Sequence, residues 1–147
     1  MGLLDQKPGD DAGSEAAQIY HASLSRCQAD PSFLEKFYES FLSASPRVAE
    51  KFKGVDFRRQ VRVLQATLYM VSLLVTGDEF AQDHLLRIAR THGPEGYNIE
   101  PDLYGLWKKT LIGTVSQTDP AFDETVEEAW HQVLQSAIEF MLTHQTP

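Results

Sequence analysis

Apolar residues recur at every third or fourth position along most of the chain. This spacing indicates helices that bury one face, because it matches the helical turn of about 3.6 residues. Runs that alternate strictly between apolar and polar residues, as half-buried strands do, are scarce. The periodicity predicts seven helices, at residues 14–29, 32–44, 46–53, 56–77, 78–91, 101–117 and 120–143. We therefore expect an all-α protein.

Proline pairs mark several of the expected helix starts. Proline is tolerated at the first helical position, and a Ser or Asp before it can cap the free N–H groups. The pattern occurs at Asp30-Pro31, Ser45-Pro46 and Asp119-Pro120, and in a weaker form at Glu100-Pro101.

The helix predicted over residues 56–77 carries apolar side chains on two of its sides. One stripe runs through Leu64, Leu68 and Val71, and a second includes Val63. A helix that is apolar on two sides is expected to be buried on both. Seven helices with short connections, several buried on more than one side, favour steep crossings around a central group over a four-helix bundle.

The length of 147 residues is that of one ordinary domain. Residues 1–13 are polar and lack the apolar core of a signal peptide, so we expect a disordered leader followed by one domain over residues 14–147. No stretch approaches the roughly 20 apolar residues that span a membrane. We therefore expect a cytoplasmic protein without a membrane partner.

Charge and cysteine content narrow the function classes. The net charge of −8 argues against a nucleic-acid surface, which needs clustered Lys and Arg. Cys27 is the one cysteine of the sequence, so a disulfide within the chain is impossible. A lone thiol is most often a small buried apolar side chain, and we expect this of Cys27.

Among the five histidines, His92 differs in its position. It follows Leu85, Ile88 and Ala89 at helical spacing, so it lies on the apolar face of its helix. Gly93 and the proline after it end that helix. An axial ligand of haem iron must reach inward without a further helical turn crowding the ring, and a His in this place meets that need. Spacing on its own makes His92 a candidate ligand and no more.

Four segments, one of which ends in His92, follow one another in a fixed order along the chain. They are the segments Phe37-Tyr38-Glu39-Ser40-Phe41, Phe57 to Leu64, Leu85 to His92 and Ile99 to Tyr104, with Ala129-Trp130 near the end. In order and spacing, these segments resemble bacterial haem globins. The resemblance covers residues 16–142 and extends to single-domain globins, sensor-type globins and the haem domain of flavohaemoglobins.

The resemblance implies a globin fold of about seven helices around one haem b, with His92 as the protein ligand of the iron. It implies that Tyr38, Gln60 and Leu64 face the bound gas on the distal side, and that Phe52 packs on the haem ring. Further pocket residues implied are Ile88, Ile99, Tyr104 and Trp107.

Two departures from flavohaemoglobins affect the expected chemistry. In that family a Glu on the last helix reaches the iron-bound His through the Tyr that matches Tyr104, whereas the matching place here falls near Gln145 and holds no Glu. Such a carboxylate would make the His ligand more basic, so we expect no peroxidase-like push at the iron. The sequence also lacks the G-x-G-x-x-G fingerprint of a nicotinamide-binding reductase.

Three functions stay open at this stage. The first is reversible binding of O2, and of NO or CO, as a gas sensor or buffer, with Tyr38 and Gln60 as hydrogen-bond donors to the ligand. The second is oxidation of NO to nitrate with a separate reductase. The third is a haem-free globin-fold signalling domain, against which an inward His92 argues. A separate reductase, a signalling partner and a homodimer are all compatible with the sequence.

Overall fold

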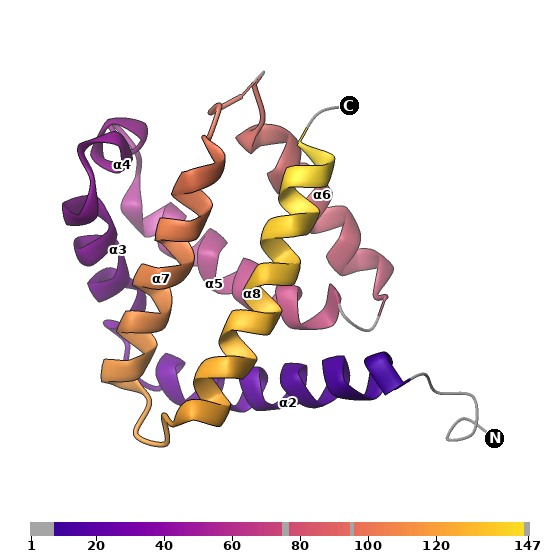
Figure 1. The fold of residues 1–147 in the computed structure, drawn as a ribbon. Helices are drawn as coiled ribbons and strands as arrows, with labels where there is room; N and C mark the ends of the chain where they lie inside the picture. The colour runs from indigo at the N-terminus through magenta and orange to yellow at the C-terminus, as the bar shows by residue number, and fades with distance from the viewer. Residues whose placement is uncertain (1–7, 75–76, 95, 146–147) are drawn as a thin grey trace.

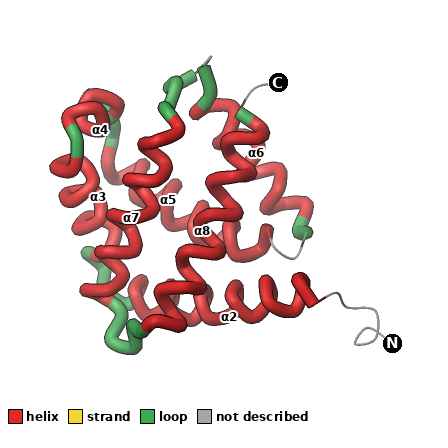
Figure 2. Tube along the Cα trace, in the orientation of Figure 1, coloured by secondary structure: helices red, strands yellow, loops and turns green. Residues whose placement is uncertain are grey.

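The computed structural model describes residues 8–74, 77–94 and 96–145, and over these residues the chain is all-helical, as the periodicity predicts (Figures 1 and 2). The described part contains seven helices and no strand. The helices are α2 (Pro8–Gln28), α3 (Phe33–Ala44), α4 (Pro46–Lys51), α5 (Phe57–Leu74), α6 (Glu79–His92), α7 (Pro101–Thr118) and α8 (Glu124–His144).

The first helix begins earlier than the sequence predicts. α2 starts at Pro8, so residues 8–13 of the expected disordered leader are helical instead. A proline fits the first turn because the N–H that it lacks has no partner inside the helix there. The remainder of the expected leader, residues 1–7, lies outside the described residues.

Of the four proline pairs, two identify helix starts correctly, and the other two come too early. Asp30-Pro31 precedes α3, which begins at Phe33, by two residues. α4 and α7 begin at Pro46 and Pro101, and the Ser45 side chain accepts a hydrogen bond from the Arg47 N–H, as a cap should. The last helix begins at Glu124 and not at Pro120, because Asp123 caps it by accepting from the Val126 N–H. The carboxylate of Asp119, the expected cap, accepts hydrogen bonds from buried and partly buried side chains of α2 instead.

α7 and α8 are neighbours, and both cross α2 (Figure 1). α3 packs against α7 and α4, while α6 packs against α5 and α8. In the described part of the chain, α7 contacts α2, α3 and α8 but does not pack closely along α5 or α6. None of the described helices has the length and apolar content needed to cross a membrane.

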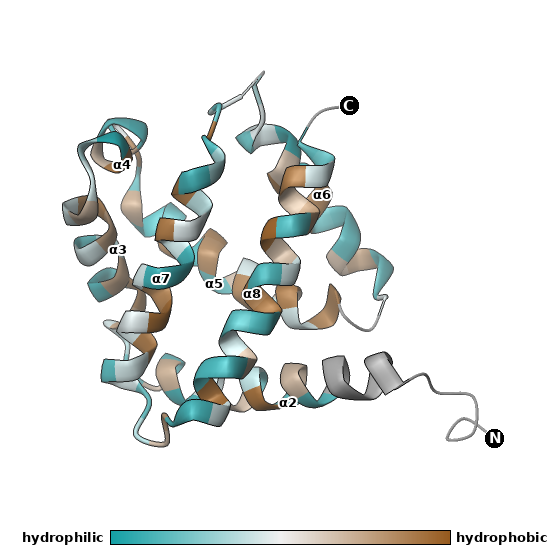
Figure 3. Cartoon of the chain, in the orientation of Figure 1, coloured by the Kyte–Doolittle hydropathy of each residue, from teal (hydrophilic) through white to brown (hydrophobic). Residues whose placement is uncertain are grey.

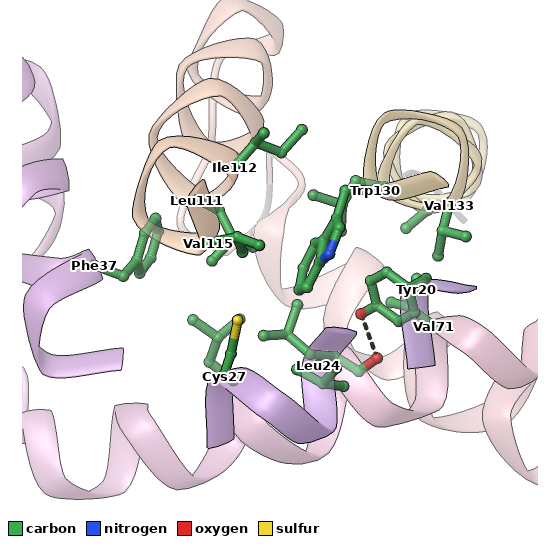
Figure 4. Packing of buried hydrophobic residues seen from close by; sticks show 14 of the residues in the cluster. Tyr20, Leu24, Cys27, Phe37, Val71, Leu111, Ile112, Val115, Trp130 and Val133 are labelled. Atoms are coloured by element: carbon green, nitrogen blue, oxygen red, sulfur yellow. Dashed lines mark hydrogen bonds between the residues drawn. The ribbon is translucent and has the colours of Figure 1, made fainter. Parts of the chain in front are cut away.

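Apolar faces meet in a core where α2, α5, α7 and α8 approach one another (Figures 3 and 4). The Tyr20 and Trp130 rings lie 4.5 Å apart, and the Tyr20 hydroxyl donates to the Leu68 carbonyl over 2.6 Å. Trp130 is fully buried, and its indole N–H donates to the Ser23 hydroxyl over 2.9 Å. Cys27 is fully buried as expected, and burial raises the pKa of its thiol to about 12.

A buried carboxylate ties α2 to the turn between α7 and α8. The side chain of Asp119 is fully buried and accepts from Arg26 Nε over 2.6 Å and from the Ser23 hydroxyl over 2.6 Å. The Ala121 N–H donates to the same carboxylate over 2.9 Å. Burial alone would raise the pKa of Asp119, but these hydrogen bonds outweigh it and the pKa is lowered.

Replacing Asp119 by Ala is expected to lower the free energy of unfolding by about 3 kcal/mol, because Ser23 and Arg26 lose a charged acceptor in a buried place. Since the folded-state pKa is lowered, the stabilisation is present above the ordinary carboxyl pKa and is lost as the pH falls through the folded value. Denaturant titrations at about pH 7 and about pH 3 measure the difference. Asp83→Ala, at an exposed position on α6, is the control. A stability gap of equal size at both pH values would contradict this role.

Candidate functional site

His92 ends α6 as the sequence predicts. Asp78 caps the start of this helix by accepting from the Ala81 N–H, and Leu85 and Ala89 bury its inner face. The Nδ1 atom of His92 lies 2.8 Å from the Ile88 carbonyl oxygen. A carbonyl only accepts, so Nδ1 carries the proton and donates. Burial lowers the pKa of His92, opposed in part by this hydrogen bond, so the imidazole is neutral and the Nε2 lone pair is free for a metal.

The loop after His92 folds back over the end of α6. The Ile99 N–H donates to the His92 carbonyl over 2.9 Å, and the Tyr97 ring stands edge-on to the imidazole with centroids 5.9 Å apart. Lys51, at the end of α4, donates to the carbonyl oxygens of Tyr97 and Asn98 over 3.0 and 2.9 Å. Lys51 thus fastens Tyr97 and Asn98, in the loop after His92, to the end of α4.

The C-terminal end of α8 also reaches this region. A Cβ atom added to Gly93 would clash with the Gln145 carbonyl oxygen, so the two backbones are in close contact beside His92. The Tyr104 hydroxyl and the Gln145 side-chain oxygen are buried and have no hydrogen-bond partner among the described residues. Burial raises the pKa of Tyr104 to about 12, so its hydroxyl stays protonated. Buried polar atoms are normally paired, so these two point to a bound group or water near them.

Gly93→Ala is expected to destabilise the protein by about 1–3 kcal/mol, because backbone atoms have to move to admit the methyl group. Gly113→Ala is the matched control, since a Cβ there meets no atom within 4 Å and Gly113 lies inside α7. Removing a glycine from a helix interior should stabilise by about 0.5–1 kcal/mol. Thermal unfolding of both variants measures the two effects, and a Gly93→Ala variant as stable as the wild type would refute the close contact.

Tyr38 lies on α3 in an aromatic group that faces the start of α5. Its ring centroid lies 5.7 Å from that of Phe52 and 5.7 Å from that of Phe57. Burial raises the pKa of Tyr38 to about 12, and a hydrogen bond with the Gln60 side chain lowers it in part. Leu64, one turn after Gln60, is 7% exposed and belongs to the same buried cluster as Tyr38. The structure therefore brings Tyr38, Gln60 and Phe52 together, and Leu64 lies one turn after Gln60 in the same apolar core.

Two side chains connect this group to the side on which His92 lies. Ile99 and Trp107 pack against the cluster that contains Tyr38 and also against the cluster formed around Ala89 and Tyr104. Ile88 packs against the latter cluster and carries the carbonyl that holds His92. Ile99 and Trp107 therefore link the Tyr38 group on α3 and α5 to the cluster beside the end of α6.

Sequence reasoning missed some members of this region. Phe57 stacks on Phe52, with centroids 5.8 Å apart, and completes the aromatic group around Tyr38. Its place as the first residue of α5 gives little indication of burial. Lys51 was also missed, because its bonds to loop carbonyls depend on contacts between distant parts of the chain.

The residues present fit the haem that the sequence resemblance implies. One neutral imidazole with a free Nε2 suits a metal that brings four ring nitrogens of its own. The apolar side chains expected to wall the haem are only partly buried, as suits residues that face a flat apolar group. They are Phe52, Ile88, Ile99 and Trp107. Two shallow surface grooves lie elsewhere, one on the outer side of α6 and one between α2 and α8.

The comparison with solved structures decides the fold. The chain is similar to the crystal structure of a protein from Pseudomonas aeruginosa PAO1 that is described as structurally highly homologous to human haemoglobin. The TM-score is 0.84 at 27% sequence identity, and the match covers 90% of this chain and 99% of the other. This chain has a globin fold. No family model and no curated protein matches it.

The globin fold confirms the fold class that the sequence predicts, and it favours none of the bacterial subtypes over the others. The match extends over nearly all of both chains.

Proposed function

We propose that this globin holds haem b through His92 and binds O2 and other diatomic gases opposite it, facing Tyr38 and Gln60. The observation that carries the proposal is the imidazole of His92. Its Nδ1 is fixed by the Ile88 carbonyl at 2.8 Å, and Ile88 packs against the same cluster as Ile99 and Trp107, which also pack against the cluster that contains Tyr38. The globin fold supports the same cofactor. Haem, once bound, would supply a ferrous iron at which a diatomic gas binds.

The remaining work falls to residues of the chain. The Tyr38 hydroxyl stays protonated at neutral pH because burial raises its pKa to about 12, so it can donate to a polar ligand. The Gln60 amide can donate a second hydrogen bond. Leu64 and Phe52 exclude water, and in a dry site each hydrogen bond contributes more than the roughly 1 kcal/mol typical in water. O2, which polarises strongly on binding, should therefore be favoured over CO.

The direct test is the absorption spectrum of the purified and haem-reconstituted chain in its ferric, ferrous, O2 and CO forms. We expect a strong Soret band, one haem per chain, and a ferrous form with an open sixth position that takes up CO. A colourless chain that does not acquire haem on reconstitution would refute the proposal and favour a haem-free signalling domain.

A gas sensor or buffer is the use we propose, and NO oxidation is its alternative. The absence of a carboxylate at Gln145 favours the first, because nothing there makes His92 more basic. Consumption of NO by the oxygenated protein with a supplied reductase separates the two. Sustained turnover would establish the enzyme, whereas a single stoichiometric reaction would support the sensor or buffer.

A further inference from the structure

Ion pairs join α4 to the start of α7, beside two walls of the proposed haem site. Arg47 donates to both carboxylate oxygens of Asp102, over 2.6 Å and 3.1 Å. One carboxylate oxygen of Glu100 lies 3.5 Å from Arg47 Nη2, and the other lies 3.8 Å from Lys51 Nζ. Two cations of α4 thus face two carboxylates at the start of α7. We call these four residues the α4 latch.

Lys51 also holds two successive carbonyls of the loop after His92, those of Tyr97 and Asn98, over 3.0 and 2.9 Å. Successive carbonyls of an extended chain point to opposite sides. Asn98 has a left-handed backbone with a φ of +52°, and here both carbonyls reach one ammonium group. The Lys51 side chain is 26% exposed, against 41% or more for the other members of the latch. Its contacts are therefore the least screened by solvent.

α4 has little else to keep it in this place. Val48 is its one buried side chain, and among the described helices α4 packs closely only against α3. Arg47 lies in the first turn of α4, where the positive end of the helix dipole disfavours a cation. The contact with Asp102, and not the stability of α4 itself, therefore accounts for an arginine at this position.

The helices at the other edges of the proposed site are held by apolar burial instead. α5, α6 and α7 bury the side chains of Leu68, Leu85 and Leu111 almost completely. This is true even of α5, on which Val63 is 39% exposed although the sequence places it on a second buried stripe. Salt weakens ion pairs between exposed groups but does not weaken apolar burial. α4 and the loop that it holds are thus the part of the wall that opens most easily.

Each side of the α4 latch carries a wall of the site. Phe52 follows Lys51 directly, and its ring centroid lies 5.7 Å from that of Tyr38. Ile99 follows Asn98 directly, and it packs against the cluster that contains Tyr38 and against the cluster beside the end of α6. Phe52 and Ile99 are both only partly buried. Separation of α4 from the loop would move Phe52 away from Ile99 and open this edge of the site.

We propose that the α4 latch is the gate of the haem site, which opens to admit or release haem and is closed by its ion pairs. The inference rests on the proposed function. Haem is rigid, flat and wide, and the packed side chains of a protein interior leave few gaps, so a wall has to move before haem can leave. The members of the latch bind one another and the loop, so the gate also exists in the haem-free chain.

The first test removes the charge of Lys51 and keeps a side chain of similar length. Lys51→Met is compared with Lys36→Met, which also removes one positive charge and one ion pair, that with Asp30 at 3.1 Å. Transfer of haem from the ferric protein to an excess of haem-free myoglobin measures the rate of loss. We expect Lys51→Met to lose haem on the order of tenfold faster and Lys36→Met to stay within about twofold of the wild type. Salt at about 0.5 M should speed the loss several-fold in the wild type and less in Lys51→Met.

The second test exchanges the charges of one pair. Arg47→Asp and Asp102→Arg should each speed haem loss, because each places like charges opposite one another. The double variant has opposite charges again and should return to within about twofold of the wild type. A loss of packing would not be restored in this way, so no rescue in the double variant, or equal haem loss from Lys51→Met and Lys36→Met, would overturn the gate.

Hydrogen exchange separates the latch from the proposed cofactor. The Ile99 N–H donates to the His92 carbonyl over 2.9 Å, and its exchange in the haem-free chain reports opening of the loop. We expect exchange on the order of tenfold faster in Lys51→Met and unchanged in Lys36→Met. Exchange that does not depend on Lys51 would overturn the latch even in a chain that binds haem. Exchange that does depend on Lys51, in a chain that takes up no haem, would refute the proposed function and leave the latch standing.

Discussion

His92→Ala is expected to abolish tight haem binding, and free imidazole should restore it in part. The reason is geometric, because the Nδ1 hydrogen bond to the Ile88 carbonyl aims Nε2 away from α6 and no substitute ligand stands beside it on that helix. The apolar walls alone would retain haem weakly. Haem content per chain, measured from the Soret band after gel filtration with and without imidazole, gives the result.

Two other histidines are controls for this prediction. His84 also lies on α6, but its Nε2 is 3.2 Å from the Thr67 hydroxyl, so His84→Ala should leave the spectrum unchanged. His144 donates through Nδ1 to the Phe140 carbonyl over 2.8 Å, with the same local geometry as His92, and His144→Ala should also have no effect. Full haem retention in His92→Ala with an unaltered ferrous spectrum would eliminate the assignment, and loss of haem in His84→Ala would move it to that residue.

The helices were predictable because helical periodicity is a local property, and the globin fold followed from the resemblance of the segments to a family. The inward face of α6 follows from the spacing of Leu85, Ala89 and His92, and the start of α4 follows from a proline behind a capping serine. The start of α8 was not predictable in this way. Asp119 has the same sequence context as a cap, but a buried contact with Arg26, distant in the sequence, takes its carboxylate.

The candidate site also contains residues that the sequence indicates and residues that only the structure reveals. Tyr38, Gln60 and His92 were proposed as site residues because the order of their segments resembles a family, and that assignment stays a prediction. Lys51 binds the loop after His92, and Gln145 contacts Gly93. Both contacts join residues far apart in the chain, and the periodicity of the sequence does not predict such contacts. Phe57 was missed for a related reason, since its burial depends on the position of α3.

Tyr38→Phe is expected to speed O2 release by on the order of tenfold, which corresponds to about 1.4 kcal/mol. The hydroxyl is buried with Gln60 as its neighbour and remains protonated at neutral pH, since burial raises the pKa of Tyr38 to about 12. It is therefore a donor to a polar ligand, and phenylalanine removes that donor while keeping the ring contacts with Phe52 and Phe57. CO release should change much less, because CO accepts hydrogen bonds weakly. Stopped-flow dissociation of O2 and CO measures both rates.

A purely structural Tyr38 would give a different result. If its hydroxyl served only the Gln60 side chain, Tyr38→Phe would cost about 1 kcal/mol of stability and leave the O2 off-rate within about twofold. Gln60→Leu is the second variant of this test, and it should also speed O2 release. Because Tyr38 and Gln60 would donate to one ligand, their effects on the O2 off-rate should be non-additive in the double variant. Additive effects, or an off-rate that Tyr38→Phe leaves unchanged, would remove Tyr38 from the gas site while leaving the globin fold and the role of His92 intact.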